Sequence, residues 1–196
     1  MEDLVEPIFI PASEFWKGKK VLVTGHTGFK GSWLSIWLSR LGAEVIGVSL
    51  PQEEKPNLFC EAQVEKLCSQ SHFCDISDSL KFPELVRSIN PDVVFHLAAQ
   101  ALVRPSYQDP VTTFSTNFMG SVHLLDAIRG LSDVRVIVMI TTDKVYKTLQ
   151  SPRPFREDDA LGGFDPYSAS KASSEIAIAS YRDAFLTKQS VAVATA

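Results

Sequence analysis

The 196-residue sequence has few cysteines, no long hydrophobic run and no excess of positive charge. Its three cysteines, Cys60, Cys68 and Cys74, are odd in number and lack Cys-x-x-Cys spacing, which argues against a disulfide framework and a zinc site. No apolar stretch approaches the roughly 20 residues that a membrane-spanning helix needs. Nineteen basic against 23 acidic residues give a formal charge of -4. We therefore expect neither nucleic acid nor a membrane as a partner, and no bound metal.

The remaining composition is that of one globular domain. The hydrophobic fraction is 45%, and the chain begins with acidic residues where a secretory signal would be basic. These features predict a cytoplasmic protein. We expect residues 1–14 to form an N-terminal extension and residues 15–196 to form a single nucleotide-binding domain.

Short apolar runs alternate with segments of helical spacing along the chain. Such runs, buried on both faces and separated by helices, are typical of a parallel sheet covered by helices. We therefore predict an α/β fold with a doubly wound parallel sheet, the Rossmann fold. The expected strands lie at residues 19–25, 44–48, 72–74, 93–97, 134–140 and 191–194.

Helices and loops are expected between these strands. Trp33 and Trp37, at i and i+4 of the first helix, should pack into the core, and a long helix should span residues 166–184. Proline, glycine and polar residues predict the loops, which are residues 50–56, 100–110 and 149–166.

A Gly-x-x-Gly-x-x-Gly loop follows the first strand and opens a helix. In this context glycines permit a tight turn and a close approach of backbone to pyrophosphate, while the helix N-terminus attracts phosphate. The alternative is a glycine-rich turn without a ligand, and Lys30 fits a phosphate contact or an exposed lysine equally well. We assign to the dinucleotide the loop residues Gly25, Thr27, Gly28, Phe29, Lys30 and Gly31.

Tyr167 and Lys171 stand at i and i+4 on one face of the long helix. An ammonium beside a tyrosine stabilises its phenolate, so Tyr167 is a candidate base for oxidising a hydroxyl group. An exposed helical pair is the alternative. The glycine loop upstream, and the polar segment from Thr141 to Lys144 at the end of the fifth strand, favour the catalytic interpretation.

Four segments together resemble the CDP-glucose 4,6-dehydratases, a family of extended short-chain dehydrogenase/reductases. They are Thr24-Gly-His-Thr-Gly-Phe-Lys-Gly-Ser-Trp-Leu34, His96-Leu-Ala-Ala-Gln100, Thr142-Asp-Lys144 and Tyr167-Ser-Ala-Ser-Lys171. The resemblance runs from about Phe15 to the end of the chain. It implies NAD as cofactor, with further cofactor contacts from Asp75, Ile76, Leu97, Ala98, Ala99, Gln100 and Asn117. A helix N-cap is the alternative role for the Asp75 segment, where it suits Asp78 better, and a satisfied buried amide is the alternative for Asn117.

The resemblance also implies the reaction. Tyr167, assisted by Lys171 and Thr142, would oxidise the C4 hydroxyl of the sugar. Asp143 would act as the acid for the departing C6 hydroxyl, and Lys144 would assist at C5 and C6. The substrate would be a nucleotide sugar, with CDP-glucose favoured, and the full-length protein would be a homo-oligomer.

Several alternatives stay open in the sequence. The second strand ends in Ser49-Leu-Pro51, with no carboxylate before Glu53 and Glu54 and no arginine, so NAD rather than NADP rests on the resemblance. Extended members of the family carry a C-terminal substrate domain, which we expect to be absent from this chain. Another nucleotide-sugar dehydratase, epimerase or reductase, and a non-catalytic dinucleotide sensor, are the competing functions.

Overall fold

The computed structural model describes residues 12–52, 55–147 and 153–196. Within them, one six-stranded sheet has the order β3-β2-β1-β4-β5-β6, and all its strand pairs are parallel. The strands are β1 (Lys20–Thr24), β2 (Glu44–Ser49), β3 (Gln70–Phe73), β4 (Val93–His96), β5 (Val136–Met139) and β6 (Ala192–Thr195). This is the doubly wound α/β order, so the predicted Rossmann fold is confirmed.

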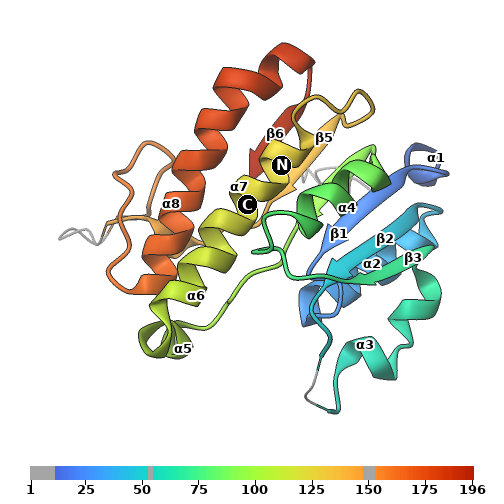
Figure 1. Ribbon diagram of the computed structural model, residues 1–196, viewed down its shortest axis with the longest axis horizontal. Helices are drawn as coiled ribbons and strands as arrows, with labels where there is room; N and C mark the ends of the chain where they lie inside the picture. Colours follow the sequence, from blue (N-terminus) through green and yellow to red (C-terminus); the bar gives the residue numbers. More distant parts are fainter. Residues whose placement is uncertain (1–11, 53–54, 148–152) are drawn as a thin grey trace, which may run out of the picture.

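Helices cover both faces of the sheet. The α-helices are α1 (Ser13–Trp16), α2 (Phe29–Arg40), α3 (Leu58–Glu61), α4 (Lys81–Ile89), α5 (Val103–Gln108), α6 (Pro110–Phe114), α7 (Gly120–Ile128) and α8 (Pro166–Tyr181). Short 3-10 segments are η1 (Val64–Leu67), η3 (Asp143–Val145) and η5 (Thr187–Gln189), and the π-helical segments are η2 (Ser115–Met119) and η4 (Arg182–Leu186). Figure 1 shows α4, α7 and α8 in front of the sheet and α2 behind it.

This division follows from the handedness of the connections. From β1 to β3 the chain moves one way across the sheet, and from β4 to β6 it moves the other way, so right-handed crossovers place the two sets of helices on opposite faces. The larger core lies under α4, α7 and α8 and includes Phe82, Leu124 and Ile178. The smaller one packs Leu38 of α2 on the other face.

Helix α2 turns its two tryptophans toward solvent, contrary to the expectation from the sequence. The side chains of Trp33 and Trp37 are each 54% exposed. The buried face of α2 consists instead of Gly31, Ser32, Ser35 and Leu38. Small residues let the helix approach the sheet closely, and this leaves no room for an indole between them.

Two other expectations about elements need correction. The expected loop at residues 100–110 contains α5, in which Pro105 occupies the first turn and therefore displaces no helical hydrogen bond. The third strand lies at Gln70–Phe73 instead of 72–74, because its pairing with β2 starts at Gln70, opposite Ile46. The long helix begins as expected at Pro166, and the side chain of Asp165 accepts a hydrogen bond from the Ser168 backbone N–H.

Some expectations fall outside the described ranges. They are residues 1–11 of the N-terminal extension, residues 53–54 of the first expected loop and residues 148–152 of the last. Among the helices of the described ranges, none is both long enough and apolar enough to cross a bilayer.

Candidate functional site

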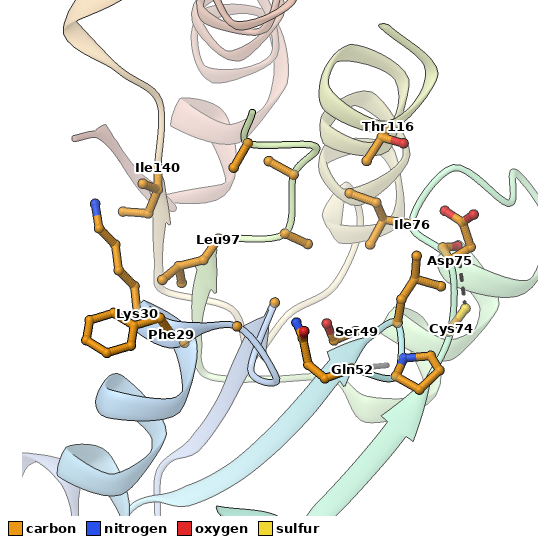
Figure 2. Close-up of a pocket in the computed structure, with 18 of the residues that line it drawn as sticks. Phe29, Lys30, Ser49, Gln52, Cys74, Asp75, Ile76, Leu97, Thr116 and Ile140 are labelled. Atoms are coloured by element: carbon orange, nitrogen blue, oxygen red, sulfur yellow. Dashed lines mark hydrogen bonds between the residues drawn. The ribbon is translucent and has the colours of Figure 1, made fainter. Parts of the chain in front are cut away.

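A cavity of about 750 Å³ opens at the carboxyl edge of the sheet, where β1 and β4 pair. The chain leaves these strands toward opposite faces, and open α/β sheets bind ligands at such a reversal. Figure 2 shows residues that line the cavity, from the strand ends and the first turn of α2. The lining consists of Gly25, Gly28, Phe29, Lys30, Gly31, Ser49, Leu50, Pro51, Gln52, Cys74, Asp75, Ile76, Leu97, Ala98, Ala99, Ala101, Thr116, Ile140, Thr141, Tyr167 and Lys171.

The three glycines of the first loop serve different purposes. Gly25 has a φ of +76°, and a Cβ there would lie 2.8 Å from the backbone nitrogen of Ala98, so the turns after β1 and β4 touch at a position that suits only glycine. A Cβ on Gly31 would lie 2.0 Å from the carbonyl oxygen of Gly25. A Cβ on Gly28 would have one neighbour within 4 Å, the carbonyl oxygen of Gly25 at 3.3 Å. Two glycines therefore permit close packing, and the third leaves space in the cavity.

The first turn of α2 presents its backbone to this cavity. Gly28 precedes the helix, and the cavity is lined by Phe29, Lys30 and Gly31 from its first turn. The first N–H groups of a helix have no partner within it, and together they carry partial positive charge. The loop and the helix therefore form a cradle suited to a phosphate group.

A chain of hydrogen bonds fixes the turn after β4. The hydroxyl of Thr24 accepts from the Ala98 backbone N–H at 3.1 Å and pairs with Nδ1 of His96 at 2.8 Å. Nε2 of His96 lies 3.3 Å from the hydroxyl of Ser121, which donates to the backbone of Asn117. Burial, and then the charge of Lys171, lower the pKa of His96 to about 3. His96 is therefore neutral at pH 7, and its hydrogen bonds fix the turn after β4.

Asn117 supports the cavity wall but does not line it. Its side chain is 1% exposed; its oxygen accepts from the Gln100 backbone N–H at 2.8 Å, and its nitrogen donates to the Gln100 carbonyl and to the Ser170 hydroxyl. These bonds fit the satisfied-amide alternative, and the Asn117 side chain lies outside the cavity lining. The side chain of Gln100 also lies outside the lining, because it bonds to the backbone of Leu102 and to Thr113.

Thr27 is likewise a supporting residue. Its side chain is 2% exposed, and its hydroxyl contacts the Ser49 hydroxyl at 2.8 Å and donates to the Leu50 carbonyl at 2.9 Å. These bonds tie the glycine loop to the end of β2. The Thr27 hydroxyl is paired within the fold, and Thr27 lies outside the cavity lining, contrary to expectation.

Asp75 and Ile76 line the cavity after β3, as predicted. One carboxylate oxygen of Asp75 accepts from the backbone N–H and the hydroxyl of Ser77, both at 2.8 Å. Asp78, by contrast, accepts from the backbone N–H groups of Leu80 and Lys81 where α4 begins. Asp78 therefore pairs with backbone N–H groups at the start of α4, whose N-cap position is Leu80, and Asp75 lines the cavity (Figure 2).

Tyr167 and Lys171 reach the cavity from the first turns of α8. The Lys171 side chain is 5% exposed, and Nζ donates to the Ile140 carbonyl at 2.9 Å. Burial lowers the pKa of Lys171 to about 8, against the opposing effect of Glu175. At pH 7 the ammonium is therefore still charged. The predicted pair comes together with the glycine loop in one cavity.

Thr142, Asp143 and Lys144 follow β5 but do not belong to the cavity lining. The Thr142 hydroxyl donates to Asp143 at 3.2 Å and accepts from the Lys144 backbone N–H at 3.4 Å. Asp143 and Lys144 are exposed. Thr141 lines the cavity instead, and its hydroxyl donates to Glu175 at 2.5 Å.

The sequence interpretation also missed residues that line the cavity. Cys74 and Thr116 stand directly before residues that it named, and Ile140 ends the expected fifth strand. The segment Ser49–Gln52 begins with the last residue of β2, and the signal that could have identified it is its position about 20 residues after the glycine loop. Ala101 and Thr141 also line the cavity without having been assigned to it from the sequence.

Comparisons with known proteins agree with this architecture. A family model described as GDP-mannose 4,6 dehydratase matches residues 22–194. The CDP-glucose 4,6-dehydratase of Salmonella typhimurium is 45% identical over 171 residues, which are 87% of this chain and 47% of that protein. The GDP-mannose 4,6-dehydratase of Vibrio cholerae is 29% identical over 174 residues, which are 85% of this chain and 46% of that protein. The chain thus spans about half the length of these curated relatives.

A solved structure shares the fold. The UDP-glucose 4-epimerase of Thermus thermophilus, a complex with NAD, matches with a TM-score of 0.73 and 28% identity. The match covers 90% of this chain and 53% of that one. The similarity thus includes nearly all of the sheet and helices described above.

Proposed function

Because this chain belongs to the GDP-mannose 4,6-dehydratase family, whose model matches residues 22–194, we propose that the protein converts CDP-glucose to CDP-4-keto-6-deoxyglucose with loss of water. The observation that carries the proposal is the meeting of the glycine loop with Tyr167 and Lys171 in one cavity. The choice of CDP-glucose rests on the identity of 45% with a CDP-glucose 4,6-dehydratase, against 29% with a GDP-mannose 4,6-dehydratase.

NAD is the cofactor that we propose for this cavity, and the residues present fit it. At Gly25 and Gly31 the backbone passes so close to neighbouring backbone that an added Cβ atom would clash with it. The glycines therefore allow a tight turn that presents backbone N–H groups at the start of α2 to a pyrophosphate. Asp75 and Ile76 would contact the adenine, and the turn at Leu97–Ala99 would approach the cofactor with its backbone. When bound, NAD supplies a reversible acceptor for hydride.

Tyr167 is the proposed base for the C4 hydroxyl of the sugar. Its phenol lies in the cavity one helical turn from the buried ammonium of Lys171. In the proposed reaction the phenol oxygen accepts the proton of the C4 hydroxyl as general base. The Ile140 carbonyl holds Nζ of Lys171 in place for this role.

Thr142, Asp143 and Lys144 are proposed to act on the sugar. Thr142 would assist Tyr167 at C4, Asp143 would protonate the departing C6 hydroxyl, and Lys144 would assist at C5 and C6. A ketone at C4 makes the C5 proton acidic, which is why water can leave across C5 and C6. Because the three side chains lie outside the cavity lining, they would contact sugar rather than dinucleotide.

We further propose that the protein acts in the cytoplasm as a homo-oligomer, with residues 15–196 as its dinucleotide-binding domain. The formal charge of -4 gives no general attraction for nucleic acid. The location, the oligomeric state and the domain bounds are proposed from the sequence.

A product assay tests the proposed reaction. The intact protein, supplied with NAD, is incubated separately with CDP-glucose, GDP-mannose and UDP-glucose, and the products are identified by mass spectrometry and NMR. We expect a 4-keto-6-deoxy sugar from CDP-glucose and much slower reaction of the other two. Epimerised UDP-sugar without loss of water would instead identify an epimerase, and dinucleotide binding without turnover of any sugar would identify a sensor.

A further inference from the structure

Two side chains of α8 hold the chain where it leaves β5. Lys171 and Glu175 stand one helical turn apart, on the same face of the helix. Nζ of Lys171 donates to the carbonyl of Ile140 at 2.9 Å. The hydroxyl of the next residue, Thr141, donates to the carboxylate of Glu175 at 2.5 Å. The helix is therefore joined to two consecutive residues at the end of the strand.

The hydrogen bond between Thr141 and Glu175 is short and involves a carboxylate. Such bonds, with oxygens about 2.5–2.7 Å apart, are about twice as strong as those between neutral groups. Glu175 is half-buried and lies outside the cavity lining. The backbone N–H of Thr141 also donates to the Ala196 carbonyl at 2.7 Å. Thr141 is thus fixed through its side chain by α8 and through its backbone by the residue after β6.

The segment Thr142–Lys144 follows Thr141 directly. In the described part of the chain, its side-chain hydrogen bonds stay within the segment, and two of its three residues are exposed. Its attachment to the rest of the fold therefore lies at its two ends. On the far side the anchors are the buried side chain of Val145 and the bridge between Tyr146 and Leu161. On the near side the anchor is Thr141, which lines the cavity.

We propose that Glu175 is a positioning residue, which holds Thr141 and thereby directs the segment Thr142–Lys144 toward the sugar. This inference rests on the proposed function, in which that segment acts on the sugar. A displacement of about 1 Å at a reacting group can cost about 100-fold in rate, so one supporting hydrogen bond can control turnover. The glycine loop belongs to another wall of the cavity, so the affinity for NAD should not depend on Glu175.

A charge effect on Lys171 is the competing explanation. Burial lowers the pKa of Lys171 to about 8, and the charge of Glu175 opposes this shift. Glu175→Gln removes the charge but keeps an oxygen that can accept from the Thr141 hydroxyl. This variant therefore separates the hydrogen bond from the charge.

The first test measures turnover of CDP-glucose and the dissociation constant of NAD for the intact protein at about pH 6.5. Glu175→Leu removes both the acceptor and the charge, so turnover should fall by about 10–100-fold while the dissociation constant changes by less than about threefold. Glu175→Gln should recover most of the lost turnover. Glu84→Leu, the same change at an exposed position of α4, should alter neither quantity.

The second test removes the other partner of the hydrogen bond. Thr141→Val keeps the shape of the side chain without its hydroxyl, and it should lower turnover about as much as Glu175→Leu. The double variant should be no slower than either single variant, because both changes remove the same bond. Hydrogen exchange measured by mass spectrometry should be faster for the amides of residues 141–147 in Glu175→Leu and unchanged for residues 25–31.

Unchanged turnover in Glu175→Leu, a Glu175→Gln protein as slow as Glu175→Leu, or additive losses in the double variant would each overturn the proposal. Equal losses of turnover and of NAD affinity would make Glu175 a purely structural residue. If Glu175→Leu does not fold, Thr141→Val decides by the same measurements. A wild type that forms no product overturns the proposed function and this inference with it, whereas an active wild type with unchanged turnover in Glu175→Leu refutes only the role of Glu175.

Discussion

Lys171 combines burial with charge, and its contribution to stability therefore depends on pH. Burial lowers its pKa from the ordinary 10.5 to about 8. Between these two values the unfolded chain binds more protons than the folded one, so the contribution of Lys171 to the free energy of unfolding rises with pH. Below that window both states are protonated, and the folded state bears the cost of a buried charge.

Replacing Lys171 with methionine should remove this dependence. Methionine keeps a long side chain but cannot titrate. Urea denaturation at about pH 7.5 and about pH 10 should therefore show the wild type gaining stability relative to Lys171→Met as the pH rises. If the difference in unfolding free energy between the two proteins stays constant or moves the other way, Lys171 does not titrate as described.

Tyr167 gives the second prediction at this scale. Tyr167→Phe keeps the ring and removes the proposed base, so turnover should fall by about 10²–10⁴-fold while the affinity for NAD is retained. Tyr181→Phe, a change on the same helix whose ring packs against Phe185, should leave turnover unaltered. Loss of activity in both variants, or in neither, would remove Tyr167 from the proposed role.

Sequence patterns predicted the residues that form motifs and failed on those that support them. Tyr167, Lys171 and Asp75 reach the cavity as expected. Thr27 and Asn117 do not, because their polar atoms bond to backbone groups far along the chain. Motif spacing identifies which residues lie near a ligand, but it does not show which polar atoms are already paired by the fold.

At the scale of elements, the glycine loop before α2 contains one glycine that leaves space for a ligand, Gly28, and one that permits close packing, Gly31. Gly28→Val should abolish NAD binding because the added side chain enters the cavity, while the loss of stability stays near 1 kcal/mol, the cost of a poor helix cap. Gly31→Ala should cost more stability, about 2–3 kcal/mol, because its Cβ would lie 2.0 Å from a backbone oxygen.

Calorimetric titration with NAD and urea denaturation of both variants check this distinction. The same loss of stability in both would mean that Gly28 serves packing as well. Wild-type NAD affinity in a folded Gly28→Val protein would place the pyrophosphate elsewhere.

The limits of sequence patterns at this scale are visible in α2 and α5. Trp33 and Trp37 have helical spacing, but the small residues on the opposite face bring α2 close to the sheet. α5 contains Pro105, which favours a loop in the sequence but which a first helical turn tolerates. For α2 the packing against the sheet, which no local pattern records, decided the outcome, and for α5 the position of the proline within the first turn did.

For the whole molecule, the alternation of strands and helices was sufficient to predict the doubly wound sheet. Handedness of the crossovers then brings the ends of β1 and β4 together, and with them the glycine loop and the turn after Leu97. The GDP-mannose 4,6-dehydratase family model, which matches residues 22–194, identifies the family of the chain. The position of Gln52 on the cavity wall required the structure, since only the fold places the end of β2 beside the cradle.

The most direct test of the proposed reaction follows one hydrogen atom through it. CDP-glucose deuterated at C4 of the sugar is incubated with the intact protein and NAD, and the product is examined by NMR. We predict CDP-4-keto-6-deoxyglucose that carries the deuterium at C6, because the hydrogen removed on oxidation at C4 is returned within the same site. A product without deuterium at C6, or recovery of the substrate unchanged, would contradict the proposed function.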